Sequence, residues 1–140
     1  MNVLYTAEAL ATGDGRNGQV RTDDGKIDAA LSIPKEMGGN GLGTNPEQLF
    51  AAGYAACFHS ALRTVARSLK ANVDDSAVGA KVGIGPNDAG GFGLTVTLEV
   101  SLPHLPLDEA QALADKAHQV CPYSNATRGN IEVDVIVVED

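Results

Sequence analysis

The sequence predicts an α+β fold built around one long helix. Three observations predict it: an apolar repeat at helical spacing between Gly43 and Leu69, alternating apolar residues on both sides of that stretch, and glycine-rich turn clusters between the alternating segments. The expected strands come in groups, which is typical of α+β rather than of alternating βαβ proteins. One domain over residues 1–140 fits this length, because such a chain can bury roughly 68% of its unfolded surface.

The N-terminal part predicts a three-stranded antiparallel meander. Strands are expected over residues 3–12, 19–22 and 26–33. The Asn17-Gly18 pair, in a turn cluster at 13–18, is a hairpin signal, and Asp24-Gly25 makes the second turn. A glycine-rich loop over residues 34–43 then leads into the long helix.

The start of the long helix is marked by side chains that can satisfy its free N–H groups. Thr44 or Asn45 offers a capping oxygen, and Pro46 fits the first turn, where a missing N–H costs nothing. Glu47 or Gln48 can close a capping box. The helix is expected to end between residues 72 and 76.

The first half of this helix contains no charged residue between positions 49 and 58, which predicts burial on all sides. Gly53 in its middle costs about 1 kcal/mol relative to alanine unless another group packs closely there. Cys57, one of two cysteines in the chain, also lies in this half. A cysteine in such a helix, flanked by small residues, is the feature that needs an explanation.

The C-terminal part predicts strands, one amphipathic helix and a last strand. Strands are expected over residues 78–84, 92–102 and 131–138. The helix covers residues 107–120, and Pro122 forces it to end near Cys121. The last strand is apolar on both faces near its end, as in a covered or interface strand.

Composition excludes several functions. The net charge is −8 with scattered basic residues and no tryptophan, so no nucleic-acid partner is expected. No run of about 18 apolar residues exists, so no membrane span is expected. The N-terminus lacks the basic start and long apolar core of a signal peptide. A cytoplasmic location is therefore expected, where two cysteines are more often buried thiols or redox groups than a structural disulfide.

The two cysteines allow two interpretations each. Cys57 is either a small apolar core residue or a redox nucleophile, and a buried nucleophilic thiol needs a nearby cation to ionise. Cys121 is either a second buried thiol or a resolving partner that meets Cys57 in space. His118 lies three residues before Cys121, but a zinc site with Cys57 has no evident fourth ligand, so no metal is expected.

Arg16 and Glu47 also have ordinary roles, as a solvated turn residue and a residue of the helix cap. Glu47 and Cys57 are ten residues apart, which corresponds to about 15 Å along a continuous helix. They cannot touch within one straight helix. If both serve one site, either the helix breaks, at Gly53 for example, or Glu47 serves the site of a second subunit.

Long motifs resemble the organic hydroperoxide resistance (Ohr) proteins of the OsmC/Ohr family. They are ATG at residues 11–13 with GR at 15–16, GTNPEQLFAAGY at 43–54 with ACF at 56–58, VGIG at 82–85, GGFGL at 90–94 and VCPYSNATRGN at 120–130. They occur in the family's order and cover nearly the whole chain. The run CPYSNATRGN is similar to Ohr rather than to its OsmC relatives.

The resemblance implies an OsmC-like fold, with antiparallel sheets around a long central helix, in an intertwined homodimer with active sites at its interface. It also implies a bacterial thiol peroxidase that reduces alkyl, aryl and fatty-acid hydroperoxides to alcohols. By the same resemblance, Cys57 is the peroxidatic cysteine and Cys121 the resolving one. Arg16 is the thiolate partner, and Glu47 holds Arg16 by a salt bridge.

No bound cofactor is implied; the reductant resembles an external dithiol of the lipoyl type, carried on a protein. Phe92 and Tyr123 are candidates for the wall of an apolar substrate pocket. Asp14 departs from the family's glycine-rich loop, and its carboxylate could compete with Glu47 for Arg16. The alternatives are an OsmC-type peroxidase with broader substrate use and a non-catalytic module that binds apolar ligands.

Overall fold

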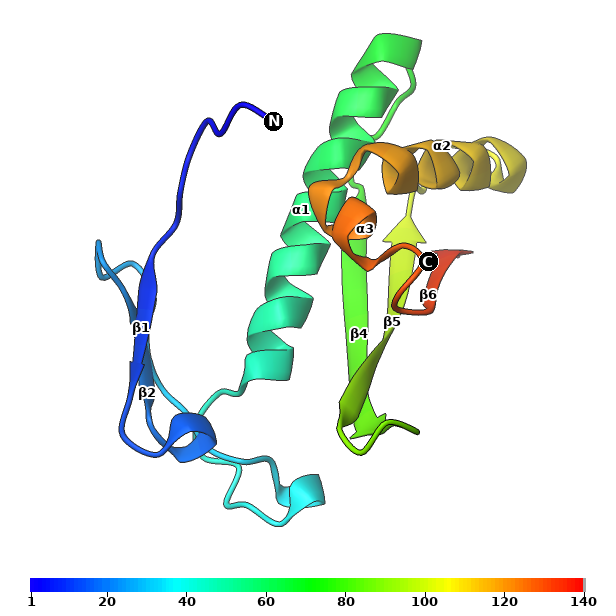
Figure 1. Ribbon diagram of the computed structural model, residues 1–140. Helices are drawn as coiled ribbons and strands as arrows, with labels where there is room; N and C mark the ends of the chain where they lie inside the picture. Colours follow the sequence, from blue (N-terminus) through cyan, green and yellow to red (C-terminus); the bar gives the residue numbers. More distant parts are fainter. Residues whose placement is uncertain (140) are drawn as a thin grey trace. The chain divides into compact units, whose positions relative to one another are not determined.

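The structure is a computed structural model that describes residues 1–139. Its elements follow the order strands, long helix, strands, helices, strand (Figure 1), so the predicted α+β class is confirmed. Contacts group the chain into two units, Met1–Leu49 and a second that begins at Phe50. The single domain over residues 1–140 stays a prediction. Within residues 1–139, no helix has the length and apolar character needed to cross a membrane.

The first unit contains the predicted antiparallel meander. Its strands are β1 (Ala9–Thr12), β2 (Gln19–Thr22) and β3 (Asp28–Ala30), in the order β1-β2-β3. The outer strands are shorter than predicted. Because β2 ends at Thr22, opposite Ala9, no strand of the described residues pairs with residues 3–8, although the Glu8 carbonyl oxygen accepts a hydrogen bond from the Asp23 N–H. The connection between β1 and β2 spans residues 13–18, as predicted, and contains the 3₁₀ turn η1 (Gly15–Asn17).

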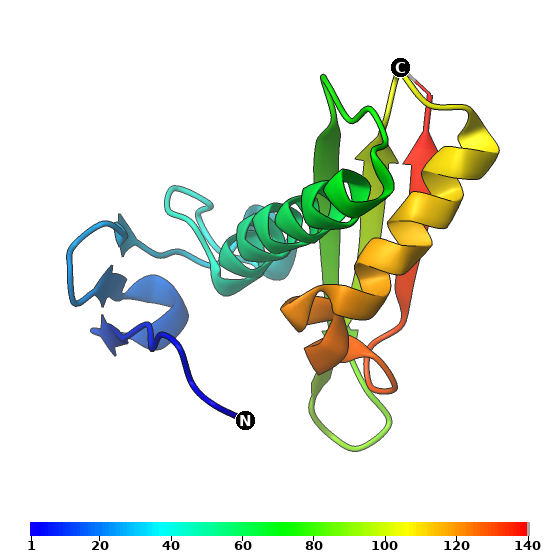
Figure 2. The same ribbon diagram turned by 90° about the horizontal axis from the view of Figure 1, so that it is seen from above.

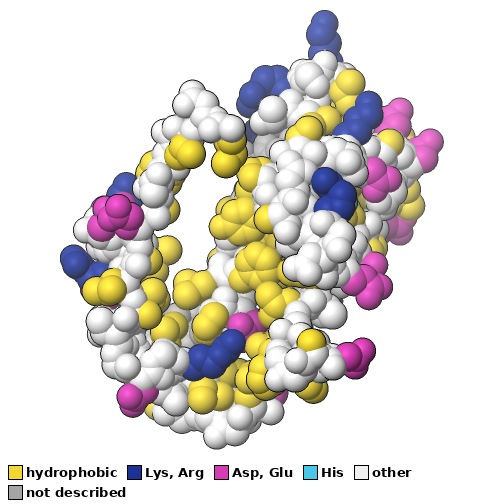
Figure 3. Space-filling view, in the orientation of Figure 1, with side chains coloured by type: hydrophobic (Ala, Val, Ile, Leu, Met, Phe, Trp, Pro, Cys, Tyr) yellow, Lys and Arg dark blue, Asp and Glu magenta, His cyan; other side chains and the backbone are white. Residues whose placement is uncertain are grey.

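The first unit has almost no core. Its buried residues are Leu31, Ser32 and Asn45, whereas every residue of β1 is exposed. Large apolar side chains such as Leu4, Leu10 and Leu42 are exposed as well, and hydrophobic side chains of this unit are visible on its surface in Figure 3. Exposed apolar side chains are unfavourable in water, so the described residues of this unit gain little stability from a hydrophobic core.

The long helix α1 (Pro46–Leu69) is unbroken. Asn45, not Thr44, caps it, because the Asn45 Oδ1 atom accepts a hydrogen bond from the Gln48 N–H at 2.8 Å. The helix ends a few residues earlier than predicted. Lys70 adopts a left-handed conformation, with φ of 56°, which is common just past a helix end.

Burial along α1 differs from the prediction for residues 49–58. Tyr54 and Phe58 are buried, but Ala52 and Ala56 on the other side are exposed, so the prediction of burial on all sides is wrong for this chain. The buried positions recur every four residues and form one stripe, which continues through Leu62. The uncharged residues opposite the stripe have small side chains that nothing in the described chain buries.

The second unit contains the sheet β4 (Ala77–Pro86), β5 (Phe92–Ser101) and β6 (Val133–Val138), in that order. β4 and β5 are antiparallel, as predicted, but β5 and β6 are parallel, which corrects the expectation of purely antiparallel sheets. The helices α2 (Leu107–Val120) and α3 (Pro122–Thr127) lie between these two strands in the sequence. These helices carry the chain back to the end of the sheet at which β5 begins, so β6 runs parallel to β5. The short α3 was not predicted.

The core of the second unit lies between one face of this sheet and the helices (Figure 2). Val96, Leu98 and Val100 alternate along β5 and are buried, as the alternation predicts. α2 buries Ala110, Leu113, Ala114 and Ala117 on one face, as expected of an amphipathic helix. Cys121, the residue that directly follows α2, is also buried, whereas Val120 is 53% exposed. Both cysteines therefore contact the main core of the protein.

Leu62→Ala should lower the free energy of unfolding by about 2–5 kcal/mol, because it leaves a cavity under a fully buried side chain. Leu69→Ala is the matched control on the same helix, where the side chain is 52% exposed and the loss should stay below about 1 kcal/mol. Urea unfolding monitored by circular dichroism measures both values. Equal losses would show that the α1 stripe is assigned to the wrong face.

Candidate functional site

The two cysteines, far apart in the sequence, meet in the second unit. The Cys57 and Cys121 sulfur atoms are 3.6 Å apart, with the Cys121 thiol donating toward Cys57. Both are free thiols; Cys121 is fully buried and Cys57 is partly accessible. A disulfide requires sulfur atoms about 2.05 Å apart, so only a small movement separates the thiol pair from a covalent bond.

The backbone fixes Cys121 on both sides. Its N–H donates to the Ala117 carbonyl oxygen at 2.9 Å, which ends α2, and its own carbonyl accepts the Asn125 N–H at 2.9 Å, which starts α3. Pro122 occupies the first position of α3, where its fixed φ favours a helix start and its ring excludes a helical conformation at Cys121. The proline that ends α2 therefore also turns Cys121 into the junction of two helices.

Burial raises the pKa of the Cys57 thiol. A hydrogen bond from the Tyr123 backbone N–H acts in the opposite direction, and the neighbouring Cys121 thiol raises the pKa further. Among the described residues, no cation contributes to this shift. Because the thiolate is the nucleophilic form of cysteine, burial without a nearby positive charge disfavours the form of Cys57 that could react.

Arg16 and Glu47 form an ion pair in the first unit. Arg16 Nη1 lies 2.6 Å from Glu47 Oε1, and Nη2 lies 3.1 Å from Oε2. The hydrogen bond to Glu47 raises the pKa of Arg16. Within residues 1–139 no ion pair joins Arg16 to Asp14. A paired guanidinium keeps donors free, so Arg16 can stay fixed while it binds a second anionic group.

An aromatic cluster adjoins the thiol pair. The ring centroids of Phe50, Tyr54 and Tyr123 are 5.6–6.1 Å apart. Gly53 contacts this cluster closely, because a Cβ atom there would lie 3.0 Å from the Tyr123 hydroxyl oxygen. This contact supplies the close packing that a glycine in the middle of a helix requires.

The two predicted pocket residues differ in their surroundings. Tyr123 stacks on Phe50 and its N–H contacts Cys57, whereas Phe92, at the start of β5, is 69% exposed and joins no ring contact among the described residues. Sequence reasoning missed Phe50. The signal was available, because Phe50 and Tyr54 are four residues apart and share one helix face.

A chain of buried hydrogen bonds links the helices around Cys121. Ser124 Oγ lies 2.7 Å from His118 Nδ1 and 2.8 Å from the Tyr54 hydroxyl, which in turn lies 3.1 Å from Thr127 Oγ1. Burial lowers the pKa of His118, and the charge of Arg128 lowers it further, so the neutral imidazole is favoured. Sequence reasoning considered His118 only as a metal ligand. Residues 1–139 contain no group of three or more metal-ligating side chains.

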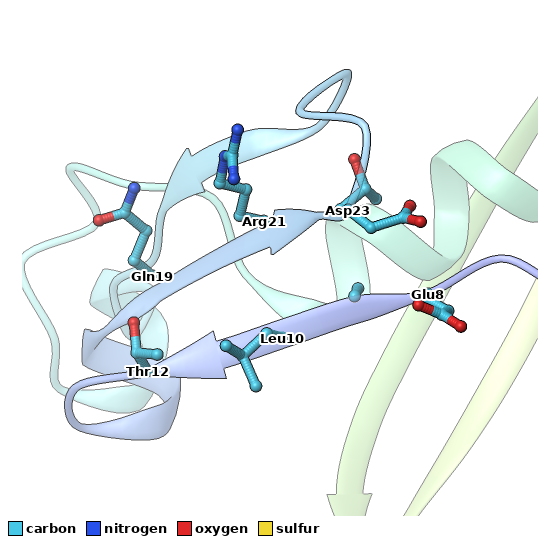
Figure 4. A pocket seen from close by; sticks show the side chains of 8 residues that line it. Glu8, Leu10, Thr12, Gln19, Arg21 and Asp23 are labelled. Carbon is cyan, nitrogen blue, oxygen red and sulfur yellow. The ribbon is translucent and has the colours of Figure 1, made fainter.

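A separate hollow of about 570 Å³ lies on the first unit, over β1 and β2. Figure 4 shows its lining side chains, which include Glu8, Leu10, Thr12, Gln19, Arg21 and Asp23. It contains no cysteine or histidine, and its polar groups surround exposed Leu10. This hollow belongs to the uncovered apolar surface of the first unit rather than to the thiol site.

Comparison with known proteins identifies the family. The family model described as OsmC-like protein matches residues 38–136. The organic hydroperoxide resistance protein of Xanthomonas axonopodis pv. citri is 56% identical, over 94% of this chain and 92% of its own length. The protein OhrB of Bacillus subtilis, which has the same description, is 45% identical, over 93% and 95% of the two chains.

Solved structures agree with this result. The crystal structure of an organic hydroperoxide resistance protein from Elizabethkingia anophelis superposes with a TM-score of 0.94 at 54% identity, covering 100% of both chains. The resemblance found in the motifs therefore extends to the fold of the whole chain. The chain belongs to the OsmC/Ohr family of OsmC-like proteins.

Proposed function

We propose that this protein is a cysteine-based peroxidase that reduces organic hydroperoxides to alcohols. The observation that carries the proposal is the 3.6 Å distance between two free thiols, one of them partly accessible. Relatives with 45–56% identity are described as organic hydroperoxide resistance proteins, which supports this substrate class. Alkyl, aryl and fatty-acid hydroperoxides are the substrates we propose, in the cytoplasm, where two cysteines fit a reducing compartment.

In the first step, the Cys57 thiolate attacks the terminal oxygen of R–O–O–H. The O–O bond breaks, Cys57 becomes a sulfenic acid, and the alkoxide takes up a proton to leave as an alcohol. The Cys121 thiol then attacks the Cys57 sulfur. The S–S bond forms, the S–O bond breaks, and water leaves with the thiol proton. An external dithiol, which we propose is of the lipoyl type on a carrier protein, reopens the disulfide by exchange.

Arg16 is the proposed cation for the Cys57 thiolate. Burial raises the pKa of this thiol without an opposing positive charge, and the Arg16 guanidinium is fixed by Glu47. It would favour the thiolate and stabilise charge on the leaving oxygen. Because α1 is unbroken, a break at Gly53 cannot bring Glu47 to Cys57. We therefore favour the other alternative, in which Arg16 and Glu47 serve Cys57 of a second copy of the chain.

The exposed apolar surface supports such a homodimer. Residues 1–49 have almost no core and leave Leu4, Tyr5, Leu10 and Leu42 exposed. The uncharged half of α1 also leaves small residues exposed opposite its buried stripe. A second copy would cover apolar surface that is unfavourable in water, at about 25 cal/mol per Å² buried.

Treatment of the reduced protein with one equivalent of cumene hydroperoxide should remove two hydrogens and link Cys57 to Cys121. Intact mass followed by peptide mapping measures this. Cys57→Ser should abolish the reaction, and Cys121→Ser should give a single turnover that stops at an oxidised Cys57. An unchanged mass with hydroperoxide remaining would mean inert thiols, and would favour a non-catalytic module that binds apolar ligands.

Arg16→Ala should move the pH profile of hydroperoxide reduction to higher pH. Without the guanidinium, no positive charge offsets the burial that raises the pKa of Cys57, and each unit by which that pKa is higher lowers the thiolate fraction about tenfold at a pH below it. Stopped-flow rates between pH 5 and pH 9 (roughly the range where thiols titrate) test this. The control is Arg21→Ala, which removes an exposed cation beside Asp28. Identical profiles for all three proteins would exclude Arg16 as the thiolate partner.

Cumene hydroperoxide should be reduced with a higher kcat/KM than hydrogen peroxide, because each buried CH₂ group contributes about 0.8 kcal/mol. Tyr123→Ala should reduce this preference more than Phe92→Ala, since Tyr123 adjoins Cys57 and Phe92 is largely exposed. Equal rates for the two peroxides in the unmodified protein would contradict an apolar pocket and favour the broader OsmC-type peroxidase.

A further inference from the structure

The buried hydrogen-bond chain around Cys121 joins three helices. Tyr54 belongs to α1, His118 to α2, and Ser124 and Thr127 to α3. Tyr54 and Ser124 are fully buried, and Thr127 is 3% exposed. Buried hydroxyl groups are costly unless they are hydrogen-bonded, so each member holds its partners in place.

Three members of this chain lie close to the thiols in the sequence. Cys121 lies midway in the sequence between His118 and Ser124, three residues from each, and Tyr54 lies one helical turn before Cys57. The contact between Ser124 and Tyr54 therefore joins the segment that carries Cys121 to the helix that carries Cys57. The hydrogen bond between Ser124 and His118 joins α3 to the last turn of α2, on the other side of Cys121 in the sequence.

Arg128 reinforces this arrangement from the surface. Its Nη2 atom donates to the His118 carbonyl oxygen at 2.5 Å, and its Nη1 atom donates to Asn125 Oδ1 at 2.9 Å. The short α3 is thus attached to α2 on its outer side and to α1 on its buried side. The fold holds the residues after Cys121 more firmly than a six-residue helix could hold itself.

We propose that Tyr54, His118 and Ser124 are positioning residues that hold the Cys121 thiol against Cys57, so that disulfide formation outpaces overoxidation. This inference rests on the proposed peroxidase function. After the first step, the Cys57 sulfenic acid has two fates. Attack by the Cys121 thiol forms the disulfide and releases water. Reaction with a second hydroperoxide adds an oxygen atom to give the sulfinic acid and an alcohol.

The geometry explains why the network affects only one of these fates. The second hydroperoxide reaches Cys57 from the accessible side, whereas Cys121 is fully buried and depends on its backbone for its approach. Loosening α3 would therefore slow closure of the disulfide and leave the reaction of Cys57 with hydroperoxide unchanged. The ratio of sulfinic acid to disulfide measures this competition directly.

The test compares Ser124→Ala and Tyr54→Phe with the unmodified protein. The matched control is Ser76→Ala, which removes a similar hydrogen bond, between Ser76 Oγ and His59 Nε2 at 2.9 Å, that involves neither α2 nor α3 and so leaves the attachment of the Cys121 segment intact. Reduced proteins are mixed with increasing excesses of cumene hydroperoxide. Mass spectrometry then quantifies the disulfide, which lacks two hydrogens, and the sulfinic acid, which gains two oxygens.

We expect the ratio of sulfinic acid to disulfide to rise about three- to tenfold in Ser124→Ala and Tyr54→Phe, the effect of losing roughly one net hydrogen bond. The ratio in Ser76→Ala and the rate of the first oxidation in all variants should match the unmodified protein. His118→Asn, which retains a polar group near the Nδ1 position, should raise the ratio less than His118→Leu does.

Equal ratios in the unmodified protein, Tyr54→Phe and Ser124→Ala would overturn this inference while leaving the peroxidase function intact. If Ser124→Ala fails to fold, Tyr54→Phe decides the matter, because it keeps the buried ring and loses only the hydroxyl. A rise of the same size in Ser76→Ala would attribute the effect to general loosening and also overturn it. If the unmodified protein forms neither product, the proposed function itself fails.

Discussion

The ionisation of the Cys57 thiol is the constraint on which the proposed chemistry depends. The fold places this thiol against the core, where burial and the Cys121 thiol raise its pKa and the single Tyr123 N–H opposes them. The same burial brings the two sulfur atoms to 3.6 Å, where a disulfide can form. In the proposed mechanism, the burial that would favour an apolar substrate also disfavours the Cys57 thiolate, which is why the proposal includes a positive charge from outside this core.

The two units of the chain have complementary properties. The second has a well-packed core with two thiols, and no cation of residues 1–139 contributes to the pKa shift of Cys57. The first has a guanidinium held by two hydrogen bonds from Arg16 to Glu47, and almost no core. Assembly of two copies would cover the apolar surface of the first unit. It would also bring the Arg16 guanidinium of one copy to the Cys57 thiol of the other. We therefore regard the dimer as part of the proposed active site.

Capping residues and prolines in the sequence predicted where the two long helices begin or end. The helix of residues 107–120 was predicted to the residue because Pro122 ends it, and α1 begins at the expected cap. Errors arose where the answer depends on distant partners: the length of β1, the parallel direction of β6 and the uneven burial of α1. The cysteine roles came from family resemblance, since spacing alone left them open. Ser124 was missed because a buried hydroxyl has no sequence signal until its partners are known.

The most direct test of the central claim, that Arg16 of one copy activates Cys57 of the other, is activity in mixed dimers of Arg16→Ala and Cys57→Ser chains. The two chains carry different affinity tags, are produced together, and the mixed dimer is purified through both tags. If Arg16 acts across the interface, each mixed dimer contains one intact site, and its hydroperoxide reduction at neutral pH should exceed that of either parent dimer. Activity no greater than that of the Arg16→Ala parent would contradict the claim.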